Sequence, residues 1–221
     1  MRNFNIALLA VVVVLVASGS AFALIDDSDI KYLDFTGWDD TLIAGAGQTF
    51  VGLDAGSTAG TVDVTVTRSA GVASSLLGTT TIGTILALSG TQDFDFTFSK
   101  PLRFVVHHRT TDKLEDVTLE TTTPVGYTQI AGASVLQSPF TNGLRVDGQA
   151  FGIPPSGGAA EGQFTALGGA SAMTYTVGSD NDFYPQYDFF RVGVLTPEPN
   201  TSALAGIGLL GMVMSLRRRR N

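Results

Sequence analysis

Thr61-Val62-Asp63-Val64-Thr65-Val66-Thr67 alternates polar and apolar side chains without a break. Asp93-Phe94-Asp95-Phe96-Thr97-Phe98 repeats the alternation with phenylalanine at every apolar position. Successive side chains of a β-strand point to opposite faces of the sheet, so a period of two predicts a strand with one buried and one solvated face. We therefore expect both segments to be strands that place valines and phenylalanines in the core.

The rest of the central region continues this pattern of short apolar segments separated by Gly, Pro, Asn and Asp clusters, which favour turns. A turn at Ser99-Lys100-Pro101 should end the phenylalanine strand. No stretch of ten residues combines helical periodicity with helix caps. Residues 24–196 are thus predicted to form an all-β domain, a single antiparallel β-sandwich that is jelly-roll-like in strand number. The further predicted strands are 48–53, 79–88, 102–106, 116–121, 128–136, 144–151, 161–166, 172–177 and 187–195.

The first 23 residues have the organisation of a secretory signal peptide. Arg2 supplies a positive start, an unbroken apolar stretch covers 6–16, and Ala21-Phe22-Ala23 has the small-x-small pattern of a cleavage site. We expect signal peptidase to cut between Ala23 and Leu24. An uncleaved N-terminal helix is the alternative, which the cleavage pattern disfavours.

The last 25 residues, 197–221, have the organisation of a membrane tail. Pro197-Glu198-Pro199 precedes an apolar segment, 201–216, which is expected to be a transmembrane helix and is followed by Arg217, Arg218, Arg219 and Arg220. Sixteen helical residues span about 24 Å against roughly 30 Å of hydrocarbon, so the predicted helix is a short span. The arginines should stay in the cytoplasm by the positive-inside rule, which leaves the preceding domain outside.

This order of tripeptide, apolar segment and basic block resembles the PEP-CTERM sorting signal. The resemblance covers the tail alone. It implies export across the inner membrane and processing at Pro197, Glu198 and Pro199 by an exosortase, a membrane-embedded enzyme. It also implies a final location at the cell surface or in an exopolysaccharide matrix, as in a biofilm. A plain, permanent C-terminal anchor is the alternative.

Composition excludes several classes of function for residues 24–196. With eight basic and nineteen acidic residues, this region carries a net charge of −11, which repels phosphate backbones and argues against binding to nucleic acids. The chain has no cysteine, so thiol catalysis and thiolate metal sites are excluded. Gly206-Ile207-Gly208-Leu209-Leu210-Gly211 matches a dinucleotide fingerprint, but it lacks the required strand–helix context.

No residue pattern indicates a catalytic centre. His107 and His108 are the two histidines of the chain, and neighbours on a strand point to opposite faces, so they should not bind one metal ion together. Ordinary polar contacts at a strand end are the expectation for this pair. We therefore expect a protein that is not an enzyme, with a polysaccharide hydrolase or lyase as the remaining alternative.

Two acidic clusters in predicted loops provide the oxygen ligands that Ca²⁺ prefers. The first contains Asp26, Asp27 and Asp29, and the second contains Asp180, Asn181 and Asp182. Neither has the spacing of an EF-hand, and solvated turn residues are the simpler interpretation. No cofactor is therefore expected, although Ca²⁺ stays open as a ligand.

Trp38 is the single tryptophan and lies beside Asp39 and Asp40. An aromatic face next to carboxylates can bind a sugar ring, whereas packing in the core is the alternative interpretation. The sequence as a whole predicts an exported structural or adhesive β-sandwich at the cell surface. A carbohydrate-binding module that uses Trp38, with or without Ca²⁺, is the leading alternative, and exopolysaccharide would be the partner.

Overall fold

The computed structural model describes residues 25–40, 45–69, 74–86, 90–110, 116–132, 134–148, 160–179 and 186–195. Apart from one 3₁₀ turn, η1 (Asp27–Asp29), the regular structure in these ranges is β-strand. Every strand pair is antiparallel. The predicted all-β class is therefore confirmed.

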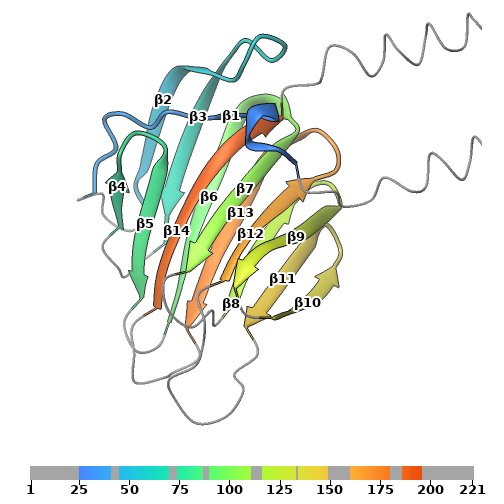
Figure 1. Cartoon of the computed structure of the whole chain (residues 1–221). Coiled ribbons are helices and arrows are strands. Elements are labelled where there is room, and N and C mark those ends of the chain that lie inside the picture. Colours follow the sequence, from blue (N-terminus) through green and yellow to red (C-terminus); the bar gives the residue numbers. More distant parts are fainter. Residues whose placement is uncertain are drawn as a thin grey trace, which may run out of the picture.

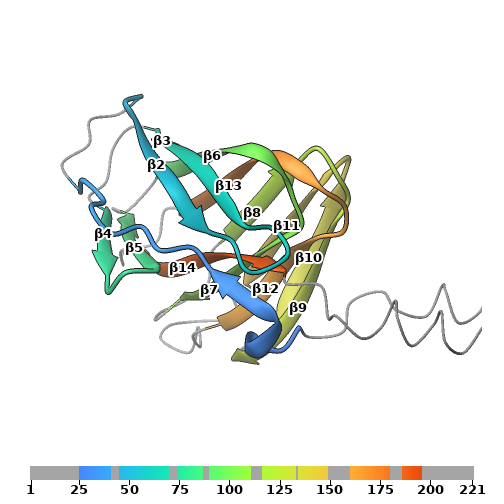
Figure 2. The same cartoon turned by 90° about the horizontal axis from the view of Figure 1, so that it is seen from above.

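The fourteen strands in the described ranges form two seven-stranded sheets, which lie as two layers in Figure 2. This number is larger than the eight strands of a jelly roll. Sheet A has the order β4 (Ser74–Leu77), β5 (Thr81–Leu86), β14 (Gln186–Leu195), β7 (Phe104–Thr110), β12 (Ala160–Ala166) and β9 (Val125–Gly132), with β1 (Ile30–Tyr32) also paired to β14. Sheet B has the order β10 (Val135–Phe140), β11 (Gly143–Gly148), β8 (Asp116–Thr121), β13 (Ala170–Ser179), β6 (Gly90–Leu102), β3 (Thr61–Arg68) and β2 (Gly47–Asp54).

The core between the sheets is built from the residues that alternate along each strand. The valines of β3 and the phenylalanines Phe94, Phe96 and Phe98 of β6 are at most 3% exposed, as the sequence pattern predicts. Sheet A faces them with Phe104, Phe164 and Phe190. Edge-to-face ring contacts connect the two layers, for example between Phe94 and Phe190, whose ring centroids are 4.9 Å apart. Such pairs add stability beyond the area they bury.

The chain crosses between the layers at most of its connections (Figure 1). Among the described strands, sequence neighbours pair directly in three hairpins, β2–β3, β4–β5 and β10–β11. Elsewhere, adjacent strands of a sheet come from distant parts of the sequence. In sheet A this connectivity places β14, β7 and β12 side by side, so residues near 107, 161 and 191 share one surface.

The predicted turn at Ser99-Lys100-Pro101 is wrong, because β6 runs on to Leu102 and the break falls at Arg103. Pairing between β3 and β6 ends at Phe98. Beyond that point one edge of β6 has no partner in β3, so the missing N–H of Pro101 removes no hydrogen bond from that pairing.

Two further boundaries differ from the prediction. The predicted strand 128–136 is divided between β9 in sheet A and β10 in sheet B, after Gly132 adopts a φ of 95° that favours glycine. The predicted strand 79–88 begins later, because Gly78, with a φ of 90°, turns the chain from β4 into β5. The strands β1 and β4 were not predicted.

The two ends of the described domain lie next to each other. In the antiparallel β1–β14 pair, Ile30 is opposite Leu195, so β1 begins where β14 ends (Figure 1). The predicted signal peptide, 1–23, and the predicted apolar helix, 201–216, lie outside the described residues. No helix within the described part of the chain is long and apolar enough to cross a membrane.

Candidate functional site

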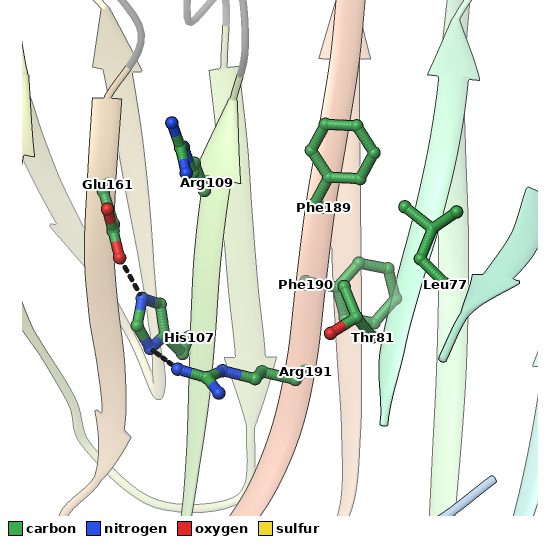
Figure 3. Close-up of a pocket in the computed structure, with 8 residues that line it drawn as sticks. All are labelled: Leu77, Thr81, His107, Arg109, Glu161, Phe189, Phe190 and Arg191. Carbon is green, nitrogen blue, oxygen red and sulfur yellow. Dashed lines mark hydrogen bonds and ion pairs between the residues drawn. The ribbon is translucent and has the colours of Figure 1, made fainter. Parts of the chain in front are cut away.

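The outer face of sheet A carries a hollow of about 470 Å³ at the centre of the sheet. It is lined from five strands, β4, β5, β7, β12 and β14, and Figure 3 shows the lining side chains. Because side chains alternate along a strand, His107 and Arg109 of β7 point outward together, as do Phe189 and Arg191 of β14. The lining residues are Leu77, Thr81, His107, Arg109, Glu161, Phe189, Phe190 and Arg191.

His107 is the centre of a polar network in this hollow. Its Nε2 lies 2.7 Å from Glu161 Oε1, and its Nδ1 lies 3.0 Å from Arg191 Nη2 (Figure 3). A guanidinium donates hydrogen bonds and accepts none, so Nδ1 must be the acceptor. The imidazole is therefore neutral and carries its proton on Nε2, from which it donates to the Glu161 carboxylate.

The same network holds the N-terminal segment against the sheet. Arg191 Nη2 donates to Asp27 Oδ2 at 3.0 Å, and the Tyr32 hydroxyl donates to Asp27 Oδ1 at 2.8 Å. The Arg191 guanidinium also lies 3.9 Å above the centre of the Tyr32 ring, within cation–π distance. Two hydrogen bonds between the Gln163 amide and the backbone of Ile25 extend the attachment. The Arg191 guanidinium is thus held between His107 of the sheet and the N-terminal segment that carries Asp27 and Tyr32.

The pKa of His107 is lowered from its ordinary value of 6.5, mainly because burial disfavours the charged ring. The hydrogen bond to Glu161 opposes this effect, and the positive charge of Arg191 adds to it. As the pH falls through 6.5, the unfolded chain binds a proton at His107 before the folded chain does. We therefore expect this residue to lower the free energy of unfolding below pH 6.5, by at most about 1.4 kcal/mol per pH unit.

Urea unfolding between pH 7.5 and 5.5 measures this effect on the purified full chain. His107→Gln is the matched variant, because its amide can still donate to Glu161 and accept from Arg191 but does not titrate. The pH slope of the variant should be smaller than that of the parent. Equal slopes in the two proteins would contradict the role given to His107.

The hollow has one polar and one apolar wall. Arg109, Glu161 and Arg191 form the polar wall, and Phe189 and Leu77 form the apolar wall (Figure 3). Arg109 is exposed, and within the described ranges no carboxylate lies within ion-pair distance of it. Both nitrogens of His107 are engaged by neighbours, so the ring is not positioned as a general base. The arrangement is suited to binding an anion beside an apolar ring.

A second polar cluster lies inside the sandwich and is closed to solvent. His108 and Asp188 are fully buried, with His108 Nδ1 3.8 Å from Asp188 Oδ1. The Tyr175 hydroxyl donates to Asp188 at 2.8 Å, and Tyr127 lies 3.0 Å from the other ring nitrogen of His108. The prediction that His107 and His108 face opposite sides of one strand is confirmed. The expectation of a strand end is wrong, because both lie within β7.

The structure gives the first acidic cluster a role within the protein. Asp26 accepts a hydrogen bond from the Ser28 backbone N–H at 2.8 Å and caps η1, which lowers its pKa. Asp27 binds Tyr32 and Arg191. Within the described ranges, no group of three or more His, Asp or Glu side chains could hold a metal ion. Asp180, Asn181 and Asp182 lie outside these ranges.

Trp38 is half-buried in the loop after β1 and packs against the core. Its ring stacks on Phe50 at a centroid distance of 6.2 Å and an interplanar angle of 8°. One face of the indole is therefore occupied by Phe50. The predicted glycan contact at Trp38 stays a prediction.

Sequence reasoning did not single out Arg109, Glu161 or Arg191. A signal was present in the residues on the solvated face of each strand. In sheet B these positions carry acids and threonines, such as Asp63, Asp95 and Thr97. In β7 and β14 they carry His107, Arg109, Phe189 and Arg191 instead. The outer face of sheet A thus differs in its side chains from that of sheet B.

Residues 195–220 match the family model of the PEP-CTERM protein-sorting motif. The resemblance found in the tail is therefore confirmed, and it implies export, a membrane-anchored sorting signal and processing by an exosortase. No curated protein and no solved structure matches the chain. The match begins at the last residue of β14 and leaves the sandwich itself without an assigned family.

Proposed function

We propose that this protein is an exosortase-sorted component of the cell surface or extracellular matrix, in which the β-sandwich is the structural or adhesive part. The sorting motif at residues 195–220 is the observation that carries the proposal. The net charge of −11 over residues 24–196 suits a soluble exported domain. The large aromatic core can stabilise that domain without disulfides, since the chain has no cysteine.

The position of the chain ends supports sequential processing at one membrane. Ile30 and Leu195 are paired across β1 and β14, so the predicted signal peptide and the sorting motif join the same end of the sandwich. Thr201, where the predicted apolar helix begins, is six residues after Leu195, and this segment spans at most about 20 Å of extended chain. While the tail is in the membrane, the folded domain is therefore held within about that distance of it.

The intact mass and both termini of the protein recovered from the surface and medium of its host test this proposal. We expect an N-terminus at Leu24 and a C-terminus close to Glu198, with or without an added group. A C-terminus at Asn221 in all fractions would instead mean a permanent membrane anchor. Recovery from the cytoplasm alone would contradict the proposal.

A carbohydrate-binding role is the second candidate, and the hollow on sheet A favours it. Sugar sites in proteins combine an aromatic or apolar surface with a few fixed polar groups, as Phe189, Arg109 and Glu161 do here. We propose binding rather than hydrolysis or elimination of the sugar. Both ring nitrogens of His107 are hydrogen-bonded, to Glu161 and to Arg191, so neither is free to accept a proton from a substrate. Neither Ca²⁺ nor another cofactor is needed for this role.

A further inference from the structure

We infer that the hollow on sheet A binds a carboxylate-bearing sugar, a single uronic acid unit carried on a polysaccharide. This inference rests on the proposed carbohydrate-binding role and specifies its ligand. The volume of about 470 Å³ falls in the range of small-molecule sites. It is open to solvent on the outer face of the sheet, so a sugar within a longer chain can reach it.

The carboxylate requirement comes from Arg109. It is an exposed arginine that no described carboxylate neutralises, at the rim of a hollow that also contains Arg191. Residues 24–196 have eight basic side chains in total, so two of the eight meet at this one place. Arg191 is committed to Asp27 and His107, which leaves Arg109 to form a bidentate pair with an incoming carboxylate.

The sugar requirement comes from the opposite wall. Phe189 and Leu77 offer an apolar surface to the C–H face of a pyranose ring, a contact that inorganic anions cannot use. Leu77 is 48% exposed, so its side chain is accessible to a ligand in the hollow. Glu161 in the polar wall and Thr81 on the side of Leu77 add hydrogen-bonding groups for the sugar hydroxyls (Figure 3).

Isothermal titration of the full-length protein in detergent with trimers of galacturonate, mannuronate and guluronate tests the inference. We expect at least one trimer to bind and its methyl ester, which keeps the ring but loses the charge, to bind about tenfold more weakly or worse. Acetate should compete poorly. Binding of none of the trimers, equal binding of the methyl ester, or equally effective competition by acetate would overturn the inference.

Four variants assign the binding to this hollow. Arg109→Gln should lose about tenfold or more in affinity, and Arg109→Lys should retain part of it as a point charge. Phe189→Ala should weaken binding of the trimer without changing binding of acetate. Arg103→Gln removes an exposed arginine outside the hollow and should have no effect. An unchanged affinity in Arg109→Gln would place the ligand elsewhere and overturn the inference.

The outcome of the titration does not depend on how the tail is processed in cells. Titration uses purified protein, so a chain that binds the trimer but keeps its tail in cells would contradict the proposed surface location alone. A correctly processed chain without affinity for any trimer would contradict the ligand alone. Far-UV circular dichroism of each variant separates a lost contact from a lost fold.

Discussion

Phe190→Ala is expected to lower the free energy of unfolding by about 3–5 kcal/mol, the range measured for large aromatic deletions in cores. The Phe190 ring is 1% exposed and touches both layers of the sandwich. Its centroid lies 4.6 Å from that of Tyr175 and 4.9 Å from that of Phe94. Removing it would open a cavity between two sheets whose backbones cannot collapse into the space.

Phe189→Ala is the matched control for this prediction. It removes the same side chain from the neighbouring position of β14, where the ring faces the hollow and is partly solvated. The expected loss in the free energy of unfolding is below about 1 kcal/mol, while binding of the acidic sugar weakens. Urea unfolding of both variants provides the comparison. Equal destabilisation by the two would mean that β14 does not divide core from surface at this point.

The fold class could be predicted because polar and apolar residues alternate along any strand that has one solvated and one buried face. The β3 valines and β6 phenylalanines are such cases. Where that condition fails, prediction fails. In β10, all but the first residue are exposed, so no alternation marks the strand. In β7, five consecutive residues are buried, so the predicted strand, 102–106, covers the start of β7 but stops short of His107.

The candidate site could not be predicted in the same way, because its residues meet through long-range pairing. His107 lies opposite both Gln163 and Arg191, residues more than fifty positions away in the sequence. The order β14–β7–β12 that creates this contact depends on how the chain crosses between sheets. Local patterns carry no information on that order, so Arg191 and Glu161 appeared as isolated charges.

Asp27 shows why the role of a single residue could not be predicted from the sequence. In the sequence it belongs to an acidic cluster of the kind that binds Ca²⁺. In the structure its carboxylate accepts hydrogen bonds from Tyr32 and Arg191 and attaches the N-terminal segment to sheet A. Arg191, its partner in this attachment, lies 164 residues away, beyond any local motif.

Replacing Pro197, Glu198 and Pro199 together by alanine is expected to abolish processing of the tail. The motif match covers these residues, and they follow the end of β14 almost directly. The tripeptide lies in the short segment between the folded domain and the apolar residues, where an enzyme at the membrane can reach the chain. The variant should accumulate in the membrane fraction with Asn221 still present, as shown by intact mass.

The matched control changes the two residues after the tripeptide, Asn200 and Thr201, to alanine. This variant keeps the tripeptide and the distance to the sandwich, so it should be processed like the parent. Because β1 and β14 are unaltered, both variants should unfold at the parental urea concentration, and a difference between them reports recognition rather than folding. Normal processing of the triple-alanine variant would mean that the exosortase reads the apolar segment and the arginines alone.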